Sequence, residues 1–204
     1  MSNDLKAGVW SPKQGRNLRS CKIGIVGLGS IGKELAHRLQ RFGCEIISAS
    51  RSWNDDFAKE NSVTRKSIHE LFSISNIVSI HLPMDDETKN MITRDLIRSM
   101  PPGGILVNTS RAGVIDNDAV VQSLLDGHLS GAAIDVFDDE PNAEPYSTVP
   151  NVILSPHIGS HTRETRLAME LMATENLIAV EKFSQQPHGA DTKELLSYLE
   201  KVTI

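Results

Sequence analysis

Three residues that could do acid–base and carboxylate chemistry follow short apolar runs of this sequence: Arg111, Glu140 and His157. They lie in three polar segments, Asn108–Gly113, Asp135–Pro141 and Ser155–Ser160. Ligands of an open α/β sheet bind outside the carboxyl ends of its strands, so segments that follow strands can converge. Singly, these residues could be a surface charge, a turn residue before proline and a packed histidine. Together, an arginine, a glutamate and a histidine form a coherent site for 2-keto acid chemistry.

A glycine-rich turn, Gly27-Leu28-Gly29-Ser30-Ile31-Gly32, lies between an apolar run and a helical pattern. In this context Gly27 permits a tight turn, Gly29 lets a pyrophosphate approach the backbone, and Gly32 lets helix and strand pack closely. The start of the helix then presents free N–H groups to the phosphates. The alternative is a glycine-rich turn without a ligand. The strand–turn–helix context favours a dinucleotide site.

The residues after the second apolar run bear on which dinucleotide would bind. An acidic residue about 20 positions beyond such a motif would bind the ribose hydroxyls of NAD. That place falls at Ser50, followed by Arg51 and Ser52. A guanidinium flanked by two hydroxyls could bind a 2′-phosphate, which favours NADP over NAD. The alternative is that Arg51 is a solvated loop charge and the site is permissive.

The elements that must position these residues alternate along the chain, which predicts a doubly wound α/β domain with a parallel sheet, a Rossmann fold. Continuous apolar runs fit strands that are covered on both faces. The predicted strands are Lys22–Val26, Glu45–Ala49, Ile77–Ile80, Gly104–Asn108, Gly131–Val136 and Val152–Leu154. The predicted helices are Ile31–Phe42, Ser67–Phe72, Arg94–Met100, Asn117–Leu125 and a long one from His161 to about Phe183.

Domain organisation and composition set the remaining expectations. We expect residues 1–21 to be an arm or linker, residues 22–184 the dinucleotide-binding domain, and residues 185–204 a polar tail with a short helix, Thr192–Val202. The net charge of −5 gives no indication of a nucleic-acid partner. No signal peptide, membrane span or metal-ligand cluster is apparent, and the two cysteines fit reduced, packed thiols. These features predict a cytoplasmic protein.

The sequence closely resembles the D-isomer-specific 2-hydroxyacid dehydrogenases, from about Gly8 to Phe183. The motifs that carry the resemblance are Gly24–Gly32, His81-Leu82-Pro83 with Thr88, Asn108–Arg111, Ala133–Phe137 ending in Glu140-Pro141, and Ser155–Gly159. The resemblance implies that Arg111 binds the carboxylate and carbonyl of the substrate. It also implies that His157 protonates the carbonyl oxygen and acts as the base in reverse. Glu140 would pair with His157 and favour its imidazolium form.

The resemblance, the glycine turn and the segment after the second strand together give a set of cofactor-binding candidates. These are Gly27, Gly29, Ser30, Ile31, Gly32, Ser50, Arg51, Ser52, Leu82, Pro83, Thr88, Thr109, Ser110, Arg111, Asp135, His157 and Gly159. The implied ligands are NADP or NAD and a small 2-keto or 2-hydroxy acid. A homodimer formed through the cofactor domain is also implied, with the arm around Trp10 as a candidate contact.

The chain departs from the family in lacking most of a separate substrate-binding domain of about 100 residues. We expect a fragment of a longer protein, a natural short form, or a chain completed by another chain. An open cleft would weaken electrostatic catalysis and substrate orientation. Two functional hypotheses follow: a 2-hydroxyacid dehydrogenase that uses Arg111, Glu140 and His157, and a cofactor-binding module without turnover that has a regulatory or interaction role.

Overall fold

The computed structural model describes residues 5–10, 12 and 14–184. These residues divide between two compact units, residues 1–157 and residues 158–204. The predicted tail, residues 185–204 with its helix Thr192–Val202, lies outside the described residues. The predicted division into arm, domain and tail stays a prediction.

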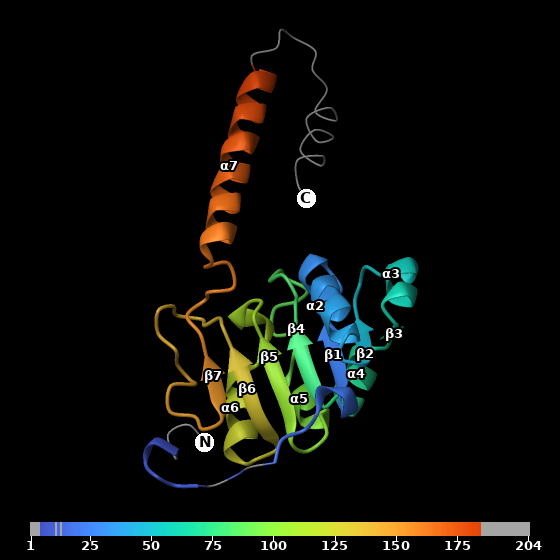
Figure 1. Cartoon of the computed structure of the whole chain (residues 1–204), viewed down its shortest axis with the longest axis vertical. Coiled ribbons are helices and arrows are strands. Elements are labelled where there is room, and N and C mark those ends of the chain that lie inside the picture. Colours follow the sequence, from blue (N-terminus) through green and yellow to red (C-terminus); the bar gives the residue numbers. More distant parts are fainter. Residues whose placement is uncertain (1–4, 11, 13, 185–204) are drawn as a thin grey trace. The chain divides into compact units, whose positions relative to one another are not determined.

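The first unit is built around a seven-stranded parallel sheet with the order β3-β2-β1-β4-β5-β6-β7 (Figure 1). The strands are β1 (Lys22–Val26), β2 (Glu45–Ala49), β3 (Val63–Arg65), β4 (Ile77–Ile80), β5 (Gly104–Asn108), β6 (Leu129–Ile134) and β7 (Val152–Leu154). The chain runs outward from β1 to β3 and then returns to place β4 on the other side of β1. The order therefore reverses between β1 and β4, where such sheets bind ligands. The predicted doubly wound fold is confirmed.

Helices connect successive strands of this sheet. They are α2 (Ser30–Gln40), α3 (Asp55–Glu60), α4 (Ile68–Ile74), α5 (Arg94–Ser99) and α6 (Asn117–Leu125), with short 3-10 turns η1 (Leu18–Ser20) and η2 (Ala112–Val114). Side-chain caps fix where several begin: Asn54 caps α3, Ser67 caps α4, and Asp116 caps α6. Each cap oxygen accepts a hydrogen bond from a backbone N–H that has no partner within the helix.

Side chains alternate between two hydrophobic cores on opposite faces of the sheet. Val26 and Ile47 belong to the core that α4, α5 and α6 cover. Ile25 and Ile46, their neighbours in sequence, belong to the core that α2 and α3 cover. Successive strand residues point to opposite faces, so burial on both sides requires an unbroken apolar run. Burial of each such side chain contributes about 1.5–3 kcal/mol.

Two elements of the first unit were absent from the sequence prediction. The short helix α3 and the strand β3 lie in residues 55–65, which are mostly polar. Strand β3 pairs with the outer edge of β2, and two of its three residues are exposed. It therefore lacks the apolar run by which the other strands were recognised. Strand β6 also begins and ends two residues earlier than predicted, because its register follows that of β5.

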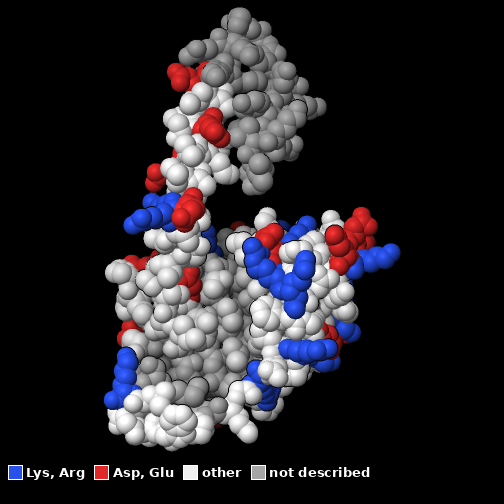
Figure 2. Space-filling view, viewed as in Figure 1, with Lys and Arg blue, Asp and Glu red and all other residues white. Residues whose placement is uncertain are grey.

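Charged side chains of both signs lie close together over α2 and α3 (Figure 2). The ion pair between Arg38 and Glu34, one turn apart on α2, is one example. This face of the first unit is therefore a mixed-charge surface.

The second unit contains the long helix α7 (Arg163–Ser184). Its apolar side chains are largely exposed; they include Leu167, Met169, Leu171, Leu177, Ile178 and Val180. Within the described part of the chain, no helix is both long enough and apolar enough to cross a membrane.

Candidate cofactor and acid–base site

The turn after β1 has the geometry that its glycines predict. Gly27 has a φ of +92°, and a Cβ there would lie 2.5 Å from the carbonyl oxygen of His81. A Cβ on Gly32 would overlap the carbonyl oxygen of Gly27, so strand and helix approach closely at this point. At Gly29, which caps α2, no described atom lies within 4 Å of a built Cβ. The backbone there is open to a ligand at the start of an 11-residue helix.

A pocket of about 840 Å³ opens beside this turn, at the carboxyl ends of β1, β2 and β4. Its volume is within the range of ligand pockets. Eight of the cofactor-binding candidates line it: Gly27, Gly29, Ser50, Arg51, Ser52, Leu82, Pro83 and Thr88. Ser30 and Ile31 lie on the first turn of α2, and Ile31 is exposed. The structure therefore places one group of the sequence candidates in one cavity.

Ser50 connects the end of β2 to the phosphate turn. Its hydroxyl accepts a hydrogen bond from the backbone N–H of Leu28 at 3.1 Å and donates one to the carbonyl oxygen of Ser52 at 2.8 Å. The next residue, Arg51, forms an ion pair with Glu87, which comes from the loop after β4. The end of β2 thus presents a hydroxyl that braces the turn and a guanidinium at the edge of the pocket.

Thr88 stabilises the loop that follows β4. Its hydroxyl proton is shared between two acceptors, the carbonyl oxygen of Pro83 at 2.7 Å and Asp85 Oδ1 at 3.0 Å, and its oxygen accepts from the backbone N–H of Asp85 at 2.8 Å. The hydrogen bonds that Thr88 donates, from its side chain and then its backbone, lower the pKa of Asp85. A separate effect acts on His81, which lines the same pocket: burial of its side chain lowers its pKa. The loop is therefore held in place by its own polar groups.

Several pocket residues were missing from the sequence candidates. The charged ones are Arg65, Lys66, Glu70, Asp85 and Glu87. Arg65 and Lys66 lie at the end of β3, the strand that the hydrophobic pattern did not reveal. Two adjacent cations at the end of a strand would have indicated a site for an anionic ligand. Arg65 and Lys66 gave no such indication because β3 was not recognised as a strand.

His157 and Glu140 form a pair in the structure, although 16 residues separate them in the sequence. The imidazole Nδ1 lies 3.0 Å from Glu140 Oε1 and 3.1 Å from Oε2. The hydrogen bond from His157, followed by one from the backbone N–H of Phe137, holds the pKa of Glu140 below its usual value. Both side chains are less than half exposed. A carboxylate at Nδ1 fixes the ring orientation and leaves Nε2 for proton transfer.

The backbone of His157 is anchored to the end of β6. Its N–H donates to the carbonyl oxygen of Asp135 at 2.9 Å, and its φ is +50°. The Ser155 hydroxyl donates to Asp135 Oδ1 at 2.6 Å, and Asp135 is buried. Asp135 thus fixes the segment that carries the histidine.

Arg111 follows β5 on a loop that a buried asparagine organises. Asn108 accepts from the N–H and hydroxyl of Ser110, and its amide donates to the carbonyl oxygen of Arg111 at 2.9 Å. The guanidinium of Arg111 is exposed and donates to the carbonyl oxygen of Ser110 at 2.7 Å. The structure thus brings Glu140 and His157 into contact. The side chain of Arg111 instead hydrogen-bonds within its own loop, which also contains Thr109. Gly159, the last of the candidates, belongs to the second unit.

The sheet order, the glycine turn and the pocket at the reversal point define a dinucleotide-binding domain. A family model described as D-isomer specific 2-hydroxyacid dehydrogenase, NAD binding domain, matches residues 1–159. The chain therefore belongs to the D-isomer-specific 2-hydroxyacid dehydrogenase family, and the matched part is its NAD-binding domain. The family resemblance seen in the sequence is confirmed.

Two of the curated proteins to which the chain is similar are reductases. The glyoxylate reductase of Aeropyrum pernix is 42% identical over 179 residues, which are 86% of this chain and 53% of that protein. The glyoxylate/hydroxypyruvate reductase B of Serratia proteamaculans is 37% identical over 183 residues, 86% of this chain and 56% of that protein. The chain thus spans about half the length of the curated relatives it matches.

Solved structures show the same likeness. A crystal structure of D-lactate dehydrogenase from Aquifex aeolicus, complexed with NAD and lactic acid, gives a TM-score of 0.82 at 27% identity. The match covers 89% of this chain and 60% of that one. A glyoxylate reductase from Paecilomyes thermophila gives a TM-score of 0.80 at 32% identity over 87% of this chain and 55% of that one.

Proposed function

We propose that this chain is the cofactor-binding half of an NAD(P)-dependent oxidoreductase that interconverts a 2-keto acid and a 2-hydroxy acid. The single observation that carries the proposal is the His157–Glu140 pair at 3.0 Å, in a domain that also has the cofactor pocket. The reductase names of the relatives favour this enzyme over a binding module without turnover. They also favour glyoxylate or hydroxypyruvate as the keto acid.

The residues around the pocket fit a nicotinamide dinucleotide. The turn from Gly27 to Gly32 leaves room for a pyrophosphate at the start of α2, and the pocket of about 840 Å³ continues past the end of β2. When bound, the nicotinamide supplies the hydride in reduction and accepts it in oxidation. The protein's own part is to bind the cofactor, orient the acid and move one proton.

His157 is the proton donor in reduction and the proton acceptor in oxidation. Its Nδ1 faces the Glu140 carboxylate, so the proton that is transferred resides on Nε2. As negative charge develops on the carbonyl oxygen, Nε2 donates its proton there, and the Glu140 carboxylate stabilises the imidazolium before that transfer. The guanidinium of Arg111 binds the carboxylate of the acid, for which its planar, two-pronged geometry is suited.

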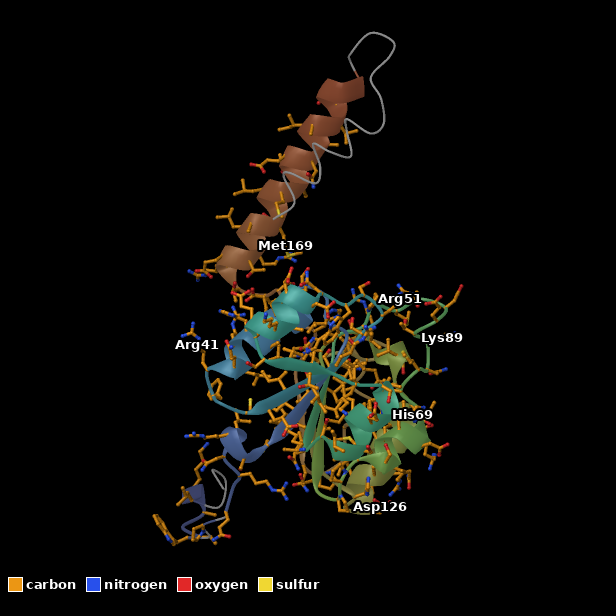
Figure 3. All side chains as sticks on the ribbon, turned by 90° about the vertical axis from the view of Figure 1, so that its right-hand side faces the viewer. Arg41, Arg51, His69, Lys89, Asp126 and Met169 are labelled. Carbon is orange, nitrogen blue, oxygen red and sulfur yellow. The ribbon has the colours of Figure 1, made fainter. Side chains whose placement is uncertain are left out.

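Turnover tests this function directly. Mixing the chain with NADPH and glyoxylate or hydroxypyruvate should give a loss of NADPH absorbance, because the acid–base pair and the cofactor pocket lie in one unit. His157→Ala should abolish that loss, since the proton donor is removed. His69→Ala, which removes an exposed histidine on α4 (Figure 3), is the matched control and should leave the rate unchanged. No turnover with any 2-keto acid would contradict the proposal for this chain.

NADP is the proposed cofactor because of the end of β2. Arg51 lines the pocket between two serines, and position 50 has a hydroxyl where an NAD-specific domain carries an acid. Arg51→Ala should therefore weaken NADP binding by about tenfold, or about 1.4 kcal/mol, and change NAD binding little. Calorimetric titration with both cofactors measures the two dissociation constants. Equal losses for NADP and NAD would contradict this preference.

The remaining partner expectation is a second copy of the chain. Trp10, in the segment before β1, is 83% exposed, and its neighbour Val9 is exposed as well. Aromatic side chains of this kind are enriched at protein interfaces. We propose a homodimer formed through the cofactor-binding unit. The cytoplasmic location stays a prediction.

A further inference from the structure

The rim of the cofactor pocket beyond Ser50 carries balanced charge. Three cations line the pocket, Arg51, Arg65 and Lys66, and so do three carboxylates, Glu70, Asp85 and Glu87. These residues come from three parts of the fold: the end of β2, the end of β3 with the start of α4, and the loop after β4. In the structure, Arg51 and Lys66 pair with carboxylates of this lining. An anionic ligand group that binds one of these cations must therefore displace its carboxylate partner.

Arg51 already has such a partner in the structure. Its guanidinium forms an ion pair with Glu87 across the pocket lining, and both side chains are about three-quarters exposed. Exposed pairs of this kind are weak, typically 0.2–1 kcal/mol, and they exchange readily. A phosphate oxygen that reaches Arg51 would therefore compete with Glu87 on nearly equal terms.

Lys66 is a second cation that can turn toward the same group. Its backbone N–H donates to the carbonyl oxygen of Ser48 on β2 at 3.0 Å, which fixes the residue beside the end of that strand. Its ammonium group lies 3.5 Å from Glu70 Oε1, a loose contact on a half-exposed surface. Arg65 is differently engaged, because its guanidinium lies over the ring of Trp53, 5.2 Å from the ring centre. Lys66 is therefore the more available of the two.

We infer that Lys66 and Arg51 together bind the ribose 2′-phosphate of the cofactor, and that Glu87 limits the preference for this phosphate by competing for Arg51. The inference rests on the NADP preference proposed above. NAD carries a hydroxyl at that position, so it leaves both ion pairs intact and its binding does not depend on them. The ratio of the two dissociation constants is thus set by one carboxylate and two cations.

Calorimetric titration of the whole chain with NADP and with NAD tests the inference. Lys66→Gln should weaken NADP binding about three- to tenfold and leave NAD binding within about twofold, because only NADP places an anion there. Glu87→Gln should tighten NADP binding about two- to fivefold, since the competing charge is gone. Arg41→Gln is the matched control: Figure 3 places Arg41 and Arg51 on opposite sides of the domain. This variant should change neither constant.

The possible contrary results distinguish failure of the inference about Lys66 and Glu87 from failure of the NADP preference. If Lys66→Gln weakens both cofactors equally, or Glu87→Gln leaves NADP binding unchanged or weaker, the inference is overturned while the NADP preference stands. If Arg51→Ala leaves the NADP-to-NAD ratio unchanged, the NADP preference itself fails, and the inference fails with it. Thermal unfolding of each variant confirms that these surface substitutions leave the domain folded.

Discussion

At the scale of single residues, the candidate site is held together by short polar contacts between segments that follow different strands. Glu140 and His157 follow β6 and β7, and Asp135 and Ser155 hold the backbone between them. Ser50 has a similar role on the cofactor side, where it braces the glycine turn. Each of these candidate residues is thus positioned by a neighbouring hydrogen bond, which can maintain the geometry of a site built on loops.

The Glu140–His157 pair predicts a particular dependence of stability on pH. The pKa of Glu140 lies below its ordinary 4.5 in the folded chain, mainly because of the hydrogen bond from His157. A carboxylate with a lowered pKa stabilises the fold above its unfolded pKa, and this contribution is lost as the pH falls through the folded pKa. The difference in unfolding free energy between the wild type and Glu140→Gln should therefore shrink as the pH falls below 4.5.

Urea denaturation of both proteins over a series of pH values measures that difference. Subtraction of the two curves cancels the contributions of Glu70, Asp85 and Asp126, whose pKa values are also lowered. A difference that stays constant from neutral pH into the acid range would show that the pair does not couple to folding.

At the scale of elements, helix caps and edge pairing decide how the site is assembled. The hydrophobic period predicted the central strands and most of the connecting helices, because each buries an apolar run or stripe. Strand β3 escaped prediction because it lies at the sheet edge and buries only Val63 of its three residues. It nevertheless brings Arg65 and Lys66 to the pocket. An edge strand can thus place residues in a pocket while its own sequence gives almost no hydrophobic pattern.

The cap of α6 offers a test of local stability that leaves the cofactor pocket intact. Asp116 accepts a hydrogen bond from the backbone N–H of Ala119 at 2.8 Å. Asp116→Ala should lower the free energy of unfolding by about 1 kcal/mol, because a helix-end donor loses its partner. Asp116→Asn retains an acceptor and should lower it much less. Chemical denaturation measures both changes, and the cofactor dissociation constants should stay as in the wild type, since Asp116 does not line that pocket. Equal losses for the two variants would exclude the cap as the cause.

At the scale of the whole molecule, the first unit holds both the candidate cofactor pocket and the His157–Glu140 pair. The chain spans about half the length of its curated relatives. Trp10 and several apolar side chains of α7 are exposed. The homodimer stays a prediction.

The sequence by itself determined the fold class, the family and the glycine turn. Apolar runs and glycine positions are local consequences of two-sided burial and close backbone approach, so they can be recognised along the chain. Arg111, Glu140 and His157 were candidates because each lies in a polar segment at the end of a predicted strand, and because together they suit 2-keto acid chemistry. Their catalytic roles stay predictions.

Only the tertiary structure decided which side chains meet. The contact of His157 with Glu140, the ion pair of Arg51 with Glu87 and the place of Lys66 beside β2 depend on the sheet order and on the rotamers of loop side chains. Such contacts join segments far apart in the sequence and leave no periodic pattern. The sequence around a charged loop residue does not differ between a residue that faces solvent and one that faces a partner. The partner is known only once the order of the strands in the sheet is known.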